Sequence, residues 1–355
     1  MDATTEEKTN LLKVSSSPHI LTEESIPGIM LAVVVALIPA FLGAVYFFGW
    51  KALLLTILAV GSTVGAEYCC QKVKGTPVTV NDFSAVVTGL LLAFNLPSNA
   101  PWWMAVVGGV FAIVIVKQIF GGLGYNIWNP ALAARAFLLA SWPTIMVSST
   151  DFPPPRGGWL AGVKLDGITQ ATPLQLIKNN IAPLLKDPGA YTAEQVNAAR
   201  VALEKMTGSE SWLALFWGRI GGVLGETSAA LLILGAVFLL VKGYIDWRVP
   251  LGYLGTVALL AWIFGGPEGY FTGDVFFHLL SGGLILGAFF MATDMVTSPV
   301  TRKGKWIFAV GCGLLTMLIR LKGGYPEGVS YAILLMNTAT PMIDMYTRPK
   351  IYGGK

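Results

Sequence analysis

Ten apolar runs, most of them long enough to cross a membrane as a helix, constrain this sequence more than any other feature. They lie at 27–49, 51–70, 82–97, 101–119, 127–146, 222–242, 249–265, 274–292, 304–321 and 328–344. Crossing a hydrocarbon core takes about 20 residues of helix. Charged residues make up only 12% of the chain, about half the share that is usual in soluble domains. The sequence therefore predicts an all-α polytopic membrane protein with about ten transmembrane helices.

One long segment of different composition, 147–221, separates the first five runs from the last five. It contains three consecutive prolines at 153–155 and a pattern that predicts a soluble helix from Ala193 to Met206. The predicted organisation is an N-terminal tail at 1–26, a first transmembrane repeat at 27–146, the segment at 147–221, a second transmembrane repeat at 222–344 and a C-terminal tail at 345–355.

Basic residues near the short loops predict the orientation, because they are enriched on the cytoplasmic side. With the N-terminus inside, most of them face the cytoplasm: Lys72, Lys74, Lys117, Lys242, Arg248, Arg302, Lys303, Lys305, Arg348 and Lys350. The opposite short loops hold only Lys51 and Lys322. This bias predicts that both termini are cytoplasmic and that segment 147–221 is extracytoplasmic.

The two sets of five runs also resemble each other. Pro97 and Gly121 enclose an apolar span of the same length as Pro299 and Gly323 do. Five is an odd number of spans, so the second half must insert with the opposite orientation, as in transporters whose sites lie at mid-membrane. The alternative is that these glycines and prolines merely permit close helix packing.

Within this comparison, Asn129-Pro130 corresponds to Thr340-Pro341. The runs at 82–97 and 274–292 are expected to be short and broken, the condition in which such folds expose backbone groups to a ligand. The prediction is thus two inverted five-helix repeats.

A polar motif, 166–174 (DGITQATPL), lies inside the long segment. A threonine before a proline commonly marks a turn or a helix start, with Thr172 as N-cap and Pro173 as the first helical residue. The free backbone N–H groups of a helix N-terminus bind phosphate. A cofactor phosphate esterified to the Thr172 hydroxyl would fit this geometry.

Several motifs in a fixed order make nearly the whole chain resemble the D subunit of the Rnf complex and the related B subunit of the sodium-translocating NADH:quinone reductase. They are 126–132 (NIWNPAL), 169–172 (TQAT), 225–228 (GETS) and 290–294 (FMATD). The second matches the family's Ser/Thr-x-Ala-Thr flavinylation signal, so the resemblance implies that Thr172 carries covalent FMN. The short N-terminal tail is more similar to the Rnf subunit.

The related quinone reductase subunit also suggests a second, non-covalent riboflavin bound by Asn126, Asn129 and Asp294. Their amides and carboxylate suit the polar edge of the ring. The alternative for all three residues is helix capping or hydrogen bonding between helices.

Ionisable residues at membrane depth are functional candidates because they are costly to bury. The sequence places eight in or near the predicted spans: Glu67, Asp82, Arg135, Glu226, His278, Asp294, Arg320 and Asp344. For Asp344 we favour an interfacial residue paired with Arg348 over a place in an ion path. Glu226 fits two interpretations, orienting the flavin segment or serving structure.

Other chemistries find little support in the composition. The three cysteines and two histidines show no metal-ligand spacing, so no metal site is predicted. A net charge of +4 does not indicate nucleic-acid binding. No GxGxxG fingerprint follows a predicted strand, so NAD is expected to bind another subunit.

The resemblance implies a flavin-carrying subunit of an ion-translocating oxidoreductase in the prokaryotic plasma (inner) membrane. Electrons would pass from ferredoxin to NAD through flavins and iron–sulfur centres on partner membrane, flavoprotein and iron–sulfur subunits, driving export of Na+ or H+. Three alternatives remain: a quinone-reductase-type B subunit, a non-redox solute channel and a passive scaffold. Flavin content separates the redox functions from the last two.

Overall fold

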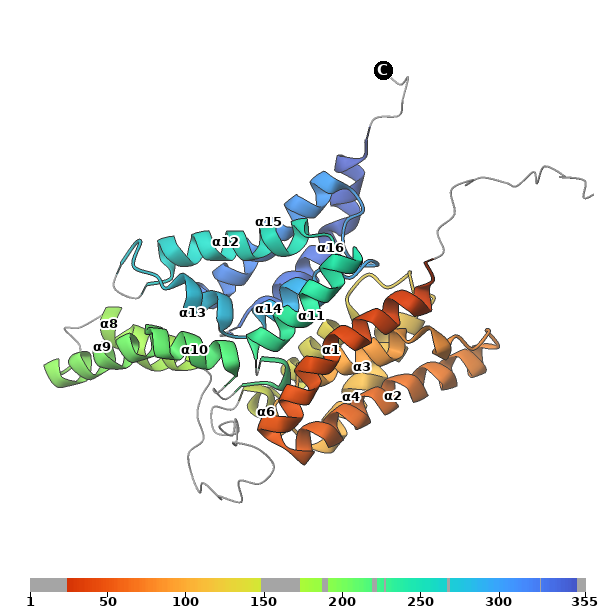
Figure 1. Ribbon diagram of the computed structural model, residues 1–355, viewed down its shortest axis with the longest axis horizontal. Coiled ribbons are helices and arrows are strands. Elements are labelled where there is room, and N and C mark those ends of the chain that lie inside the picture. The colour runs from red at the N-terminus through yellow and green to blue at the C-terminus, as the bar shows by residue number, and fades with distance from the viewer. Residues whose placement is uncertain are drawn as a thin grey trace, which may run out of the picture.

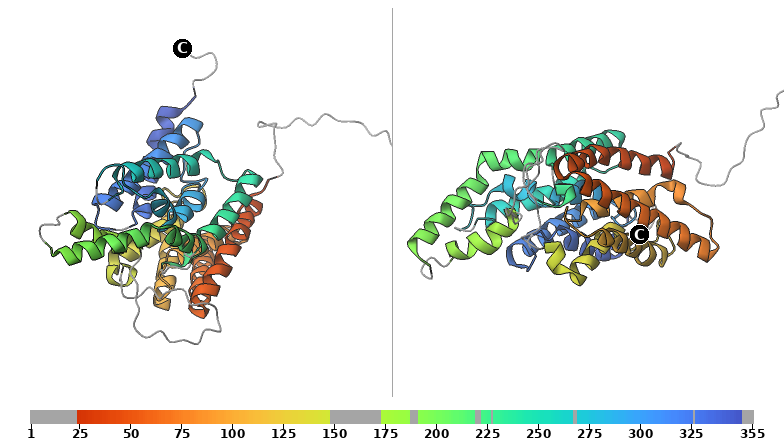
Figure 2. Two further views of the ribbon diagram at one scale, coloured as in Figure 1. Left: turned by 60° about the vertical axis from the view of Figure 1, so that its left-hand side comes forward. Right: turned by 90° about the horizontal axis from the view of Figure 1, so that it is seen from below.

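In the computed structural model, the described residues are 24–147, 173–186, 191–218, 222–226, 228–266, 269–325 and 327–349, and these ranges contain helices and no strands. Figure 1 shows helices of the first half beside those of the second, with the helices of the intervening segment projecting to one side. Figure 2 shows the same arrangement in two further views. The expected all-α class is confirmed for this part of the chain.

The first half contains the five helical regions that the apolar runs predict. They are α1 (Ile26–Phe48), α2 (Trp50–Lys74), α3 (Ser84–Phe94), α4 (Trp102–Phe111) with its π-helical continuation η2 (Ala112–Gln118), and α5 (Pro130–Ser141) followed by α6 (Pro143–Val147). A short 3-10 turn, η1 (Val80–Asp82), precedes α3. Helix α3 is short, as expected. It is continuous from Ser84 to Phe94, so the expected break in this helix is absent.

The described part of the second half also contains five helical regions, and one of them is long and broken. Its elements are η5 (Leu224–Glu226), α11 (Ala229–Lys242), α12 (Arg248–Phe264), α13 (Val275–Leu280), α14 (Leu284–Leu286), the π-helical segment η6 (Gly287–Met291), α15 (Arg302–Lys322) and α16 (Val329–Thr347). The predicted helix at 274–292 is therefore broken, as expected, and the break lies at 281–283, between α13 and α14.

The helices of segment 147–221 form a separate layer. They are α7 (Pro173–Gln175), the π-helical η3 (Leu176–Ile181), α8 (Ala182–Lys186), α9 (Ala193–Thr207) and α10 (Ser209–Trp217). Helix α9 confirms that a helix spans the predicted stretch from Ala193 to Met206. Its N-terminus is held by a capping box in which the Thr192 hydroxyl accepts from the Gln195 N–H.

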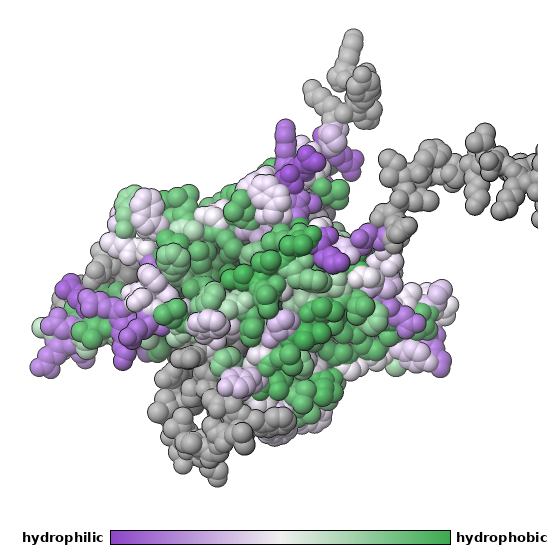
Figure 3. All heavy atoms as spheres, viewed as in Figure 1, coloured by the Kyte–Doolittle hydropathy of each residue, from purple (hydrophilic) through white to green (hydrophobic). Residues whose placement is uncertain are grey.

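Apolar side chains cover much of the outer surface. Three helices, α1, α2 and α15, are long and apolar enough to cross a membrane, and five further apolar helical stretches are shorter. Figure 3 shows the apolar residues gathered over the middle of the molecule and polar residues toward its ends. On α1, for instance, Leu31, Val35, Ile38 and Leu42 are exposed. An apolar surface of this extent identifies a membrane protein.

Two expectations about helix position are wrong. Helix α11 begins at Ala229 rather than at 222, because the Leu224 N–H bonds to the Leu96 carbonyl at 3.1 Å and holds this stretch against the end of α3. The expected match of Asn129-Pro130 with Thr340-Pro341 also fails. Pro130 is the first residue of α5, whereas Pro341 lies well inside α16.

The two halves approach closely where α1 packs against α11. Helix α1 turns small side chains toward this contact, including Ala36 and Ala40, which are buried. Gly235 of α11 faces them, and a Cβ there would lie 2.0 Å from the Ala36 carbonyl oxygen. Small residues let helix backbones pack closely where lipid offers no hydrophobic drive for association.

We expect Gly235→Ala to separate α1 from α11 and to destabilise the protein by about 1–3 kcal/mol, the usual cost of overpacking. Thermal unfolding of the detergent-solubilised protein measures the effect. Gly255→Ala is the matched control, because nothing lies within 4 Å of a Cβ at that helical position. Equal unfolding temperatures for the two variants would show that the close approach is unimportant.

Candidate functional site

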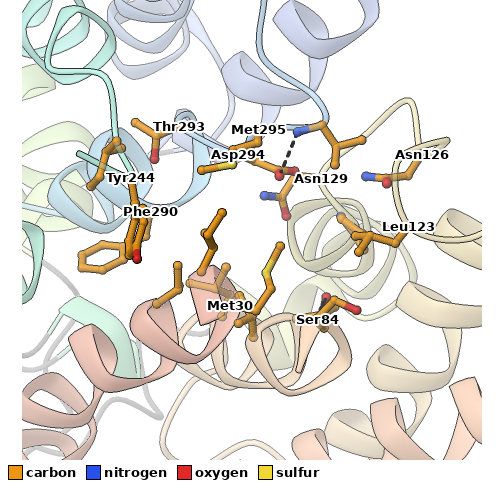
Figure 4. A pocket seen from close by; sticks show the side chains of 18 of the residues that line it. Met30, Ser84, Leu123, Asn126, Asn129, Tyr244, Phe290, Thr293, Asp294 and Met295 are labelled. Carbon is orange, nitrogen blue, oxygen red and sulfur yellow. Dashed lines mark hydrogen bonds between the residues drawn. The ribbon is translucent and has the colours of Figure 1, made fainter. Parts of the chain in front are cut away.

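A cavity between the two halves brings together the three residues predicted to bind a second flavin. Asn126, Asn129 and Asp294 all line it. Figure 4 shows these residues with Met30 of α1 and Phe290 of η6 around the same space. Residues far apart in the sequence thus face one site. The free space is about 100 Å³, which is below the usual range for ligand pockets.

Asn129 is held by the start of α5. Its Oδ1 accepts from the backbone N–H groups of Ala131 and Leu132 at 3.1 and 3.3 Å, so it is the N-cap of the helix. Its Nδ2 donates to the Met291 carbonyl oxygen at 3.4 Å, across the interface between the halves. The capping alternative is therefore confirmed for Asn129, whose amide group also lies at the cavity wall.

Asn126 and Asp294 each stabilise a local turn. The Asn126 amide donates to the Trp128 carbonyl oxygen at 3.0 Å. The Asp294 carboxylate accepts from the Val296 N–H at 3.3 Å and from the Thr297 hydroxyl at 3.1 Å. Both residues line the cavity while making these bonds, so they add polar groups to a wall that also contains many apolar side chains.

Lys117 supplies a buried positive charge to the same cavity. Its Nζ lies 2.7 Å from Glu67 Oε1, and the two side chains are 2% and 1% exposed. Lys117 also donates to the Ser84 hydroxyl at 2.6 Å, and Gln118 donates to Glu67 at 3.1 Å. The sequence places Lys117 among the basic residues near short loops that mark the cytoplasmic side. Its position near the end of an apolar run was the only signal in the sequence that it is buried.

The π-helical segments lie at the cavities. Segment η2 contributes Lys117 to the first cavity, and η6 contributes Phe289 and Phe290. Segment η3 contributes Lys178 to the second cavity described below. A π-helical turn shifts the register of side chains and is frequent at functional sites. The sequence patterns predicted ordinary helices in these places.

A second, larger cavity of about 1000 Å³ lies where η3 and α8 meet α12, α13 and α15. Leu174 lines it, together with three basic residues, Lys178, Arg320 and Lys322. Lys178 donates to the carbonyl oxygens of Ile319 and Tyr325 at 3.1 and 2.9 Å, so it fixes η3 to the end of α15. Partial burial lowers the pKa of Lys178.

Thr172 lies outside the described residues, but the helix predicted to follow it does begin at Pro173. The structure corrects the expectation for Asp344. Its carboxylate accepts from the Val300 N–H at 3.1 Å, and the described ion pairs include none between Asp344 and Arg348. Asp344 therefore ties α16 to the turn before α15.

We expect Lys117→Met to destabilise the protein by about 3–5 kcal/mol, because it leaves the Glu67 carboxylate buried without a charged partner. The double variant Lys117→Met with Glu67→Met should recover most of this loss. Lys305→Met is the control, since Lys305 pairs with a partly exposed Asp246 at 3.0 Å and should cost no more than about 1 kcal/mol. Thermal unfolding in detergent compares them; a cost for Lys117→Met no larger than the control would contradict the expectation.

Known proteins that are similar to this chain over nearly its full length are named as D subunits of oxidoreductase complexes. The chain is 50% identical over 342 residues to the D subunit of the Na(+)-translocating ferredoxin:NAD(+) oxidoreductase complex of Acetobacterium woodii, a match that covers 96% of this chain and 95% of the relative. It is 45% identical to the D subunit of the proton-translocating complex of Clostridium ljungdahlii, over 98% and 97% of the two chains. It is 36% identical to the D subunit of the ion-translocating oxidoreductase complex of Escherichia fergusonii, over 97% and 99%. The family model described as NQR2, RnfD, RnfE matches residues 13–353, and the chain belongs to this family.

Proposed function

We propose that this chain is the D subunit of an Rnf-type ion-translocating ferredoxin:NAD+ oxidoreductase complex. The observation that carries the proposal is 50% identity over almost the full length of both chains to the D subunit of such a complex. The relatives with that name include one sodium-translocating and one proton-translocating complex, so Na+ and H+ both stay candidates for the coupled ion. Membrane, flavoprotein and iron–sulfur subunits are the proposed partners.

The proposed arrangement is ten membrane-crossing regions in two inverted repeats, with both termini cytoplasmic in the prokaryotic plasma (inner) membrane. The packing of the helices supports the repeat. In the first half, α2 packs against α3 and α4; in the second, α12 packs against α13 and α15. Helices α5 and α16, each near the end of its half, also contact each other. Corresponding helices thus make corresponding contacts.

We propose covalent FMN on Thr172, seated at the second cavity. Leu174, two residues along the chain, lines this cavity, whose volume suits a cofactor. Lys178, Arg320 and Lys322 would attract the negatively charged phosphate. When bound, the flavin supplies one- and two-electron transfer. The residues of the chain hold it in place, and the covalent bond keeps it at the site between turnovers.

We expect Thr172→Val to abolish the flavin fluorescence of the denatured protein on a gel, because valine offers no hydroxyl for the phosphate ester. Thr169→Ala is the comparison variant and should have a milder effect, because its hydroxyl is not the one esterified. Peptide mass spectrometry locates the modified residue in protein purified from its own host. Fluorescence that survives in the valine variant would place the attachment elsewhere.

We also propose a non-covalent riboflavin at the first cavity. The polar groups of Asn126, Asn129 and Asp294 match the donors and acceptors on the pyrimidine edge of the ring. The flexible side chain of Met30 and the phenyl group of Phe290 border the free space. Such side chains can rearrange around a planar ring, as the small volume of the cavity requires.

Asn129→Leu and Asp294→Leu should each lower the affinity for extractable, non-covalent flavin about ten- to a hundredfold, since losing one buried partner costs about 1–3 kcal/mol. Covalent flavin on Thr172 should remain. Asn129→Ser separates the two roles of this residue, because serine still caps α5 but lacks the amide. If the serine variant keeps its full complement of flavin, Asn129 acts only as a cap. If both leucine variants keep it, the riboflavin site is wrong.

A further inference from the structure

Two exposed tryptophans lie next to each other where α12 and α15 begin. These helices pack against each other, and Figure 1 shows them side by side. Trp247 is the N-cap residue of α12, and Trp306 lies near the start of α15. Their rings meet edge to face with centroids 6.2 Å apart, and they are 50% and 38% exposed. Because tryptophan is enriched at the boundary between lipid and water, the pair indicates that this end of the two helices lies at a membrane surface.

Close packing between the helices holds Trp306 in this position. A Cβ added to Gly252 of α12 would lie 3.0 Å from Trp306 Cε3 and 2.8 Å from the side chain of Ala309. The indole ring can therefore lie against α12 because residue 252 has no side chain. The tryptophan pair is thus a fixed part of the contact between the two helices.

Basic side chains surround the tryptophan pair. The guanidinium of Arg248 lies over the Trp247 ring, 5.1 Å from its centroid, which is a cation–π contact. Arg248 and Lys305 both form ion pairs with Asp246, at 3.1 and 3.0 Å. One carboxylate neutralises only one of these two cations, so a positive charge is left without compensation.

Two further basic residues, Arg302 and Lys303, begin α15, and both are exposed. Neither of them has an ion-pair partner among the described residues. A second carboxylate at this end of the molecule, that of Asp344 in α16, accepts from the Val300 N–H at 3.1 Å. The cations outnumber the carboxylates, so this surface has an excess of positive charge.

Exposed apolar side chains follow the basic residues along both helices. On α15 they include Ile307, Val310 and Leu314, and on α12 they include Leu251. Helix α15 is long and apolar enough to cross a membrane. Positive charge, tryptophan and aliphatic side chains therefore succeed one another along the helix axis, in the order in which a phospholipid presents its headgroup, its interface and its acyl chains.

We propose that the starts of α12 and α15 form a binding surface for an anionic phospholipid. Its residues are Trp247, Arg248, Arg302, Lys303, Lys305 and Trp306. The headgroup would lie among the cations, and the acyl chains would lie along the exposed aliphatic side chains below them. In the proposed orientation this end faces the cytoplasm, where the leaflet contains anionic lipids that attract clusters of basic residues.

The apolar neighbours of the basic residues favour a lipid over an acidic protein as the occupant. An acidic protein in the cytoplasm would compensate the positive charge but would not reach the aliphatic side chains that continue into the membrane. An anionic phospholipid satisfies both parts of the surface at once. The proposal does not depend on either of the proposed flavins, because it uses no residue that lines the two cavities.

Photocrosslinking in the intact, detergent-solubilised complex tests the proposal. A photoreactive amino acid takes the place of Ile307, which lies about one turn after Lys303 and is 51% exposed. The complex is titrated with phosphatidylglycerol or with neutral phosphatidylcholine, and mass spectrometry of the crosslinked peptide gives the half-saturating concentration of each lipid. This concentration should be about tenfold lower for phosphatidylglycerol, because only its net charge complements the basic residues.

Arg302→Gln combined with Lys303→Gln should raise the half-saturating concentration of phosphatidylglycerol about thirtyfold, since each basic residue near an anionic headgroup changes affinity about five- to sixfold. Lys51→Gln combined with Lys72→Gln is the matched control. It removes two exposed positive charges from α2 and should leave the titration unchanged.

Four outcomes would overturn the proposal. They are equal half-saturation by the two lipids, an unchanged titration in the Arg302 and Lys303 variant, no crosslink at all, and a crosslink to a polypeptide instead of a lipid. The last result would show that a partner subunit covers this surface. The crosslinking of the complex that retains both basic residues decides between lipid and polypeptide even if the charge variant fails to assemble.

Discussion

The ion pair between Arg135 and Glu327 is the contact on which the relation between the two halves depends. A charge at membrane depth is costly without a partner, and each of these residues finds its partner in the other half. Removing one partner of a buried pair typically costs about 3–5 kcal/mol. The halves therefore cannot move apart here without leaving both charges unpaired. The close approach of α1 to α11 adds a second, apolar contact between them.

The packing of the helices also determines where the two cavities lie. The first lies between the halves, where Asn129 of α5 donates to the backbone at Met291. The second lies where the helices of segment 147–221 meet α12, α13 and α15, with Lys178 fixing η3 to α15. Each cavity includes a π-helical segment and at least one buried or partly buried cation. Polar groups thus lie beside irregular segments of otherwise apolar helices, the arrangement with which transporter folds bind ligands near mid-membrane.

Much of the helical framework was predictable because apolar runs about 20 residues long have few alternatives in lipid. The start of α11 was not, because 222–226 is drawn out of the helix by its bond to Leu96, far away in the sequence. The role of Asn129 as a helix cap could be foreseen, since an asparagine before a proline is a strong local signal. The prediction for Asp344 was wrong because its partner, the Val300 N–H, lies on another element.

The sequence by itself determined the class of the protein and the approximate positions of the helices, since these depend on local composition and on the length of the apolar runs. Only the tertiary structure decided that Lys117 is buried against Glu67 and that Arg135 pairs with Glu327. The physical reason is that hydropathy and periodicity indicate which faces of a segment suit lipid, water or the protein interior. The pairing of charges depends on which segments become neighbours, and that is set by the packing of the whole chain.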